Sequence, residues 1–132
     1  MNEKWYLSLD VGGRRIGVAV GDNLTKIASP VAVVINDDKA IINIKKLTEK
    51  YRIEKIIIGL PRDNRGEETA QSKYVRKFAK KLKSLKIPLI FQDESLTSVE
   101  AEARISARGD KTSIDAEAAT IILTDFLEAG SV

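Results

Sequence analysis

The 132-residue sequence contains no cysteine and no histidine. These two absences exclude disulfide bonds, zinc sites with Cys or His ligands, a cysteine nucleophile and a Ser-His-Asp triad. Acid-base or metal chemistry would therefore have to use Asp, Glu, Lys, Arg or Tyr. Carboxylate oxygens suit hard divalent cations such as magnesium or manganese.

Long hydrophobic runs are absent too, because the longest apolar stretches, such as Ile56-Ile57-Ile58, are far too short to span a bilayer. The first residues run directly into a predicted strand, so no signal peptide is expected and the predicted location is cytoplasmic. The length and the hydrophobic content of 43% predict a single folded domain over residues 1–132.

The net charge is only +3, but the charges are unevenly distributed along the chain. Before position 93 there are 19 basic and 10 acidic residues, whereas the remainder has 3 basic and 9 acidic residues. A basic body beside an acidic segment is what a magnesium-dependent enzyme acting on a polyanion needs. Ordinary solvated helix surfaces would explain the same distribution.

The segment 5–22 predicts two strands joined by a tight turn at Gly12 and Gly13. Apolar residues alternate with other residues along the first strand, and Asp10 is the anomaly near its end. A buried carboxylate is costly unless it is paired or bound to a cation. Asp10 is therefore interpreted either as a turn-capping residue or as a metal ligand at the end of a sheet.

The rest of the chain alternates between strand and helix patterns. Predicted strands cover 27–35, with Pro30 at a bulge or edge, 54–60 as a central parallel strand, and 88–91 as another buried strand. Residues 36–38 offer caps for a helix that runs to about Tyr51, and further helices are predicted over 69–85, 97–107 and 114–129. This order predicts an α/β fold with a mixed sheet and helices on both faces.

Three acidic positions lie where ligand sites gather in such sheets, at strand ends and at a helix start. They are Asp10, the pair Asp93-Glu94, and Asp115. Converging carboxylates would repel one another unless a divalent cation lay between them. Each position also has a purely structural interpretation, as a helix cap or as a first-turn acid that complements the helix dipole.

The chain resembles the YqgF/RuvX family, the Holliday junction resolvase-like nucleases. The residues that carry the resemblance are Leu9, Asp10, Gly12, Arg15–Val20, Asp22, Gly59–Pro61, Gly66, Asp93, Glu94, Leu96, Thr97, Glu100, Ala101, Asp115, Ala118, Ala119, Ile122 and Leu123. The resemblance implies a ribonuclease H-like fold with a five-stranded mixed sheet. It also implies a nuclease that matures the 5′ end of pre-16S rRNA in ribosome biogenesis. Ser95 and Gly21 depart from the family, which usually has Arg and often Ser at these positions.

Carried over by position, the catalytic and metal-binding residues implied by the resemblance are Asp10, Glu94 and Asp115. The predicted chemistry is phosphodiester hydrolysis with two Mg²⁺ or Mn²⁺ ions, in which Asp10 lies between the ions. Asp93 remains an alternative to Glu94, because either acid of the pair could face the site.

Nucleic acid, as precursor rRNA or branched DNA, is the predicted partner, either alone or in a ribosomal precursor particle. The chain would act as a monomer or weak homodimer without a membrane. Phosphate contacts are predicted at Arg14, Arg15, Arg62, Arg65 and Lys73. Residues 108–113 are predicted to be a mobile flap whose Lys111 closes on a phosphate.

Three other functions remain open. A Holliday junction or branched-DNA resolvase would use the same acids. A non-catalytic RNA-binding assembly factor would use them only structurally. The segment 9–17 also resembles the phosphate loop of sugar kinases in the actin-like ATPase superfamily, but those proteins need two such domains.

Overall fold

A computed structural model describes residues 2–93 and 114–129 of the chain. Its elements are β1 (Trp5–Val11), β2 (Arg15–Asp22), β3 (Ala28–Ile35), α1 (Ala40–Lys50), β4 (Ile53–Leu60), α2 (Ala70–Leu82), the short 3-10 helix η1 (Lys83–Leu85), β5 (Leu89–Asp93) and α4 (Ile114–Glu128). The strands form one sheet in the order β3-β2-β1-β4-β5. The β1–β2 and β2–β3 pairs are antiparallel, and β1–β4 and β4–β5 are parallel. The predicted five-stranded mixed sheet is confirmed.

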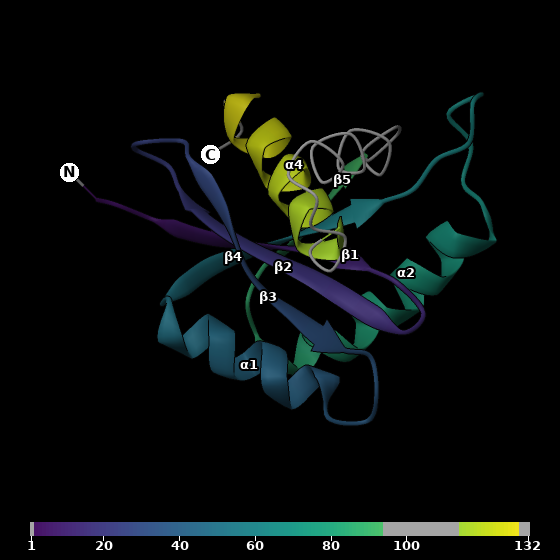
Figure 1. The fold of residues 1–132 in the computed structure, drawn as a ribbon, viewed down its shortest axis with the longest axis horizontal. Coiled ribbons are helices and arrows are strands. Elements are labelled where there is room, and N and C mark those ends of the chain that lie inside the picture. Colours follow the sequence, from purple (N-terminus) through teal and green to yellow (C-terminus); the bar gives the residue numbers. More distant parts are fainter. Residues whose placement is uncertain (1, 94–113, 130–132) are drawn as a thin grey trace.

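Helices cover both faces of the sheet, with α1 and α2 on one face and α4 on the other (Figure 1). Period-two alternation in β1 separates the two layers. Leu7, Leu9 and Val11 belong to the core under α1 and α2. Tyr6 belongs to the second core, with Ile122 and Phe126 of α4 among its members. Ser8 and Asp10 share the face of Tyr6, so the polar residues of β1 point toward α4.

The turn between β1 and β2 is held on both sides. Gly12 N–H donates to Arg15 O over 2.9 Å, which closes the hairpin around Gly13 and Arg14. A Cβ on Gly12 would lie 2.7 Å from that same Arg15 oxygen, so glycine is needed there. The Asn36 side chain donates to Gly12 O over 2.7 Å. The turn that follows Asp10 is therefore fixed in place.

The edges of the sheet confirm one prediction and correct another. Strand β3 lies at one edge, and Pro30 lies where its register with β2 shifts, as predicted. Strand β5 was predicted to be buried, and this is wrong. It forms the other edge, and Phe91 on it is 37% exposed. An apolar run alone does not distinguish a central strand from an edge strand that a helix partly covers.

Helix boundaries follow the sequence patterns with small differences. Helix α2 ends at Leu82 and continues as the 3-10 turn η1 to Leu85. Helix α1 begins after Lys39, which makes no side-chain cap itself. Of the predicted capping residues 36–38, Asp37 accepts from the Lys39 N–H over 2.9 Å, just before the helix begins. The predicted helix over 97–107 and flap over 108–113 lie outside the described residues. Within the described part of the chain, no helix has the length and apolarity to cross a membrane.

Candidate active site

Helix α4 runs antiparallel to β1, as two contacts between them show. The rings of Tyr6 and Phe126 meet edge to face, with centroids 5.9 Å apart. Two residues further along β1, the buried Ser8 hydroxyl donates to Ala119 O over 2.6 Å. From Ser8 to Asp10 the strand advances about 6.7 Å, and the four residues from Ala119 back to Asp115 advance about 6 Å along the helix axis. The next step therefore brings Asp10 of β1 toward Asp115 in the first turn of α4.

Gly17 allows this approach. It pairs with Asp10 in the β1–β2 register. An ideal Cβ on Gly17 would lie only 1.7 Å from the backbone oxygen of Asp115, so only glycine lets the helix come so close. The backbone of Asp115 thus rests on the β2 residue that pairs with Asp10. Two of the three predicted acids, Asp10 and Asp115, are therefore brought close together although they lie 105 positions apart in the sequence.

Arg15 lies at the same place, at the start of β2. Its Nε is 3.0 Å from Asp115 Oδ2, and the two side chains are 65% and 24% exposed. An ion pair between side chains this exposed stabilises the folded protein by at most about 1 kcal/mol. The pair therefore orients the Asp115 carboxylate, but it is weak enough for a divalent cation to displace the guanidinium.

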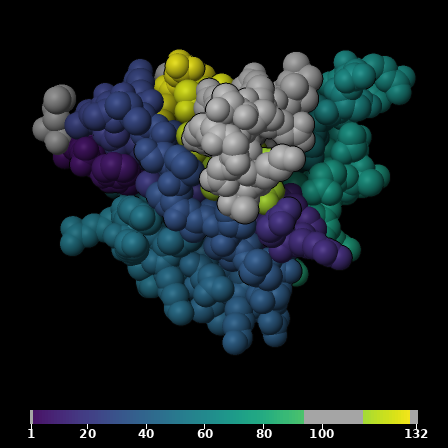
Figure 2. Space-filling model, viewed as in Figure 1, coloured from purple at the N-terminus to yellow at the C-terminus, as the bar shows by residue number. Residues whose placement is uncertain are grey.

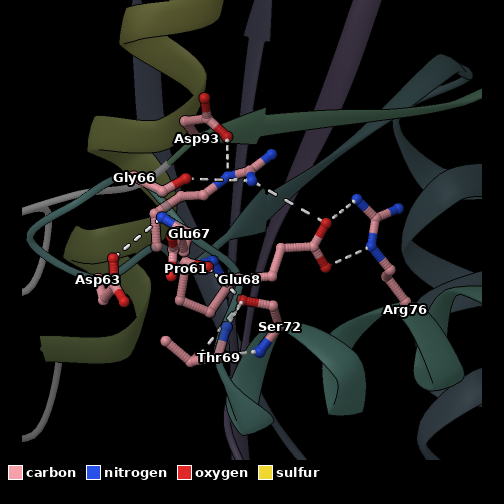
Figure 3. Close-up of polar contacts among 10 residues, drawn as sticks. Pro61, Asp63, Gly66, Glu67, Glu68, Thr69, Ser72, Arg76 and Asp93 are labelled. Atoms are coloured by element: carbon pink, nitrogen blue, oxygen red, sulfur yellow. Dashed lines mark hydrogen bonds and ion pairs between the residues drawn. The ribbon is translucent and has the colours of Figure 1, made fainter.

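Asp93 lies in a different set of contacts, shown in Figure 3. Arg62 Nε donates to Asp93 Oδ1 over 3.0 Å and lies 4.0 Å, through Nη1, from Glu68 Oε2. Arg76 of α2 donates to both oxygens of Glu68, each over 2.7 Å. The hydrogen bonds from Arg76 are the main cause that lowers the pKa of Glu68. Asp93 and Arg62 thus belong to an ion-pair network at the start of α2.

Alternation along β5 explains why Asp93 is on that side of the sheet. Leu89 packs in the core under α1 and α2, and the Phe91 ring contacts Arg76 of α2. Ile90 instead packs against the core under α4. Asp93 has the parity of Leu89 and Phe91, so its side chain lies on the α2 face. Glu94 lies outside the described residues.

The other predicted phosphate-binding residues lie on three separate elements. Arg14 is exposed in the β1–β2 turn, and Lys73 is exposed on α2. Arg65 is exposed in a turn where the Asp63 carboxylate accepts from the N–H groups of Arg65 and Glu67. The segment 61–69 projects from the body of the molecule (Figure 2). Lys111 lies outside the described residues.

Sequence reasoning missed the role of the small residues in β2. Gly17, Ala19 and Gly21 alternate along the strand, and Gly21 would also crowd α4, since its Cβ would lie 3.1 Å from Leu127 Cδ1. A strand face made of Gly and Ala is typical of a place where another backbone approaches closely. That pattern was the available signal for the docking of α4.

Asp22, one of the residues shared with the family, is a structural acid. It is 2% exposed and accepts hydrogen bonds from the Thr25 hydroxyl and from the N–H groups of Leu24 and Thr25. Burial alone would raise the pKa of the Asp22 carboxyl, but these hydrogen bonds outweigh it and lower the pKa. Asp22 therefore caps the β2–β3 turn.

The donor set at the site is suited to a hard cation. Asp10 and Asp115 contribute carboxylate oxygens on one face of the sheet, which Mg²⁺ and Mn²⁺ prefer as ligands. Across residues 2–93 and 114–129, no group of three acidic side chains converges closely enough to hold a metal. Of the three predicted ligands, two are described and Glu94 is not.

Comparison with known proteins identifies the family. A sequence model of the RuvX family, described as Holliday junction resolvase, matches residues 4–129. A protein of Chloroflexus aurantiacus named "Putative pre-16S rRNA nuclease" is 40% identical, over 98% of this chain and 90% of its own length. A Synechocystis protein of the same name is 41% identical, over 92% of this chain and 86% of its own.

Solved structures show the same fold. The RuvC protein of T. thermophilus, in complex with a Holliday junction substrate, superimposes with a TM-score of 0.58 at 15% identity, covering 96% of this chain and 95% of its own. The fowlpox virus resolvase superimposes with a TM-score of 0.56 at 14% identity, covering 97% of this chain and 99% of its own. These matches confirm the ribonuclease H-like fold that the family resemblance implied. The chain therefore belongs to the RuvX family and is a nuclease of this fold.

Proposed function

We propose that this chain is a divalent-metal-dependent nuclease that hydrolyses phosphodiester bonds during 5′-end processing of pre-16S rRNA. Relatives about 40% identical over nearly the whole chain carry that name. The single observation that carries the proposal is the contact of Gly17 with Asp115, which brings Asp115 beside the β1–β2 position of Asp10. A ribosomal precursor particle in the cytoplasm is the partner that we propose.

The proposed catalytic residues are Asp10, Glu94 and Asp115, which would hold Mg²⁺ or Mn²⁺. For Glu94 the support is the alternation of β5: Ile90 packs toward α4, and Glu94 has the parity of Ile90. Asp93 has the opposite parity and pairs with Arg62, which favours Glu94 as the ligand. When bound, the cations would lower the pKa of the attacking water and stabilise the charge on the leaving oxygen.

The chain's own residues would orient the acids and the substrate. Ser8 fixes α4 to β1, so the first turn of the helix cannot slide away from Asp10. Arg15 pairs with Asp115, and its exposed guanidinium would turn to a substrate phosphate once a cation holds the acid. Arg14, Arg65 and Lys73, all exposed, would contact phosphates further away. RNA affinity is then expected to fall steeply with salt.

The test is cleavage of two substrates by the protein and by Asp10→Asn in Mg²⁺ or Mn²⁺. The substrates are an RNA that spans the 5′ end of 16S rRNA with its leader, and a four-way DNA junction. Asp10→Asn preserves the shape of the side chain but removes charge, so it is expected to fold and bind RNA. Its cleavage should fall by about two orders of magnitude or more. Glu49→Gln, an exposed residue of α1, is the control and should cleave normally.

The outcomes separate the alternative functions. Cleavage of the junction but not of the RNA would support the Holliday junction resolvase that the family description names. If Asp10→Asn cleaves like the parent, the acidic-site mechanism is wrong. If the parent binds RNA and cleaves neither substrate with either cation, the chain is a binding factor in ribosome assembly.

A further inference from the structure

A groove lies between α2 and the edge strand β5, on the face of the sheet opposite α4. It encloses about 300 Å³ and is lined by Arg76, Ala79, Lys80, Lys83, Leu89 and Phe91. Its floor is apolar, and its rim carries three cations. None of these residues belongs to the proposed catalytic site, because that site lies on the α4 face.

Phe91 is the unusual residue in the groove. Phe91 lies on an edge strand and is 37% exposed, although most large apolar side chains of the sheet are buried. The Arg76 guanidinium carbon lies 4.9 Å from the centre of the ring. The guanidinium therefore lies over one face of the ring, and this Phe91–Arg76 pair, called the platform below, lines the groove.

Arg76 is already paired with an acid in this arrangement. Its Nε and Nη2 both donate to Glu68, each over 2.7 Å, so these donors are already used. One side of the guanidinium lies over the Phe91 ring, and the Arg76 side chain is still 43% exposed. Guanidinium planes and aromatic rings are the surfaces on which unpaired bases stack. Lys80 and Lys83, in contrast, have no acidic partner among the described residues. Their charges are available to phosphates.

We propose that this groove binds a single-stranded segment of nucleic acid, with a base on the Phe91–Arg76 platform and phosphates at Lys80 and Lys83. A cationic rim around an aromatic floor complements a chain that has both phosphates and unpaired bases. A base within a duplex cannot reach the platform, so single strands are preferred. The inference rests on the proposed function only for the class of ligand; binding in the groove needs neither a cation nor cleavage.

The experiment measures fluorescence anisotropy of a labelled 12-nucleotide single-stranded RNA, and of its duplex, with the full chain in EDTA. Phe91→Leu removes the ring but keeps an apolar side chain, and it should weaken single-strand binding about five-fold or more without changing the salt dependence. Lys80→Gln with Lys83→Gln should make the slope of log K against log salt shallower by about 1.4. Lys45→Gln with Lys46→Gln, two exposed lysines of α1, is the matched control and should leave both quantities unchanged.

Photocrosslinking with a 4-thiouridine version of the same RNA provides a readout that needs no variant. The expected adduct lies at Phe91 or on an adjacent groove residue. The inference is overturned if no adduct lies in the groove, if Phe91→Leu binds the single strand like the parent, or if Phe91→Leu weakens duplex binding as much as single-strand binding. Failure of RNA cleavage with this pattern intact would count against the proposed function alone.

Discussion

Replacing Gly17 by alanine tests the contact on which the proposed active site depends. The new Cβ would lie 1.7 Å from Asp115 O, whereas real Cβ contacts are essentially never closer than 3.0 Å. The obstacle is backbone rather than a flexible side chain, so the start of α4 must retreat by at least about 1.3 Å. Asp115 would move together with the start of α4, away from Asp10 and Arg15.

The expected cost follows from this displacement. Overpacking of a tightly packed interface costs about 1–3 kcal/mol of folding stability. A misplacement of about 1 Å in a catalytic group lowers the rate by roughly two orders of magnitude. Gly17→Ala should therefore remain folded but be less stable and nearly inactive. Urea unfolding measures the first effect, and cleavage of the pre-16S RNA in Mg²⁺ measures the second.

Gly13→Ala is the matched control, because a Cβ at this exposed turn position meets nothing within 4 Å. It should unfold and cleave like the parent. If Gly17→Ala has the stability and the cleavage rate of the parent, the close approach of α4 to β2 is not what positions Asp115, and the reasoning fails.

Arg15→Gln removes the guanidinium that competes with a cation for Asp115, so Mn²⁺ affinity measured by calorimetry should rise by up to about five-fold while RNA binding weakens. Unchanged or weaker Mn²⁺ binding would contradict this. Tyr6→Phe should raise the free energy of unfolding, measured by thermal denaturation, by about 1 kcal/mol, because the buried Tyr6 hydroxyl has no hydrogen-bond partner among the described residues. A clear loss of stability would reveal a partner. Asp22→Asn should destabilise the fold by about 1–3 kcal/mol at pH 7, because the charged carboxylate is stabilised by its hydrogen bonds. The lowered pKa of Asp22 means that this stabilisation is full above the unfolded-state pKa of about 3.9. It is lost as pH falls through the folded pKa, so parent and variant should converge in urea titrations below about pH 4, and a pH-independent difference would refute the assignment.

The sequence alone determined the elements whose signals are local. Alternation of apolar and other residues defined β1 and β2, and the helical spacing of Ala118, Ala119, Ile122 and Leu123 defined α4. These patterns depend only on the direction in which successive side chains point. The sequence likewise identified Asp10 and Asp115 as candidates, because a carboxylate is unexpected at the end of an apolar strand and notable in a first helical turn.

Only the tertiary structure decided what covers each face of each strand and which residues are neighbours. The periodicity of β5 does not say that it is an edge strand, so Phe91 was expected to be buried and is exposed. Arg62 was expected to contact phosphate, and its ion pair with Asp93 became visible only once β4 and β5 were paired. The approach of Asp115 to Asp10 depends on α4 crossing β2 at Gly17, a contact between residues nearly a hundred positions apart. Such contacts depend on how layers pack against each other. The small residues of β2 indicate a face that another backbone can approach, but not which segment approaches it.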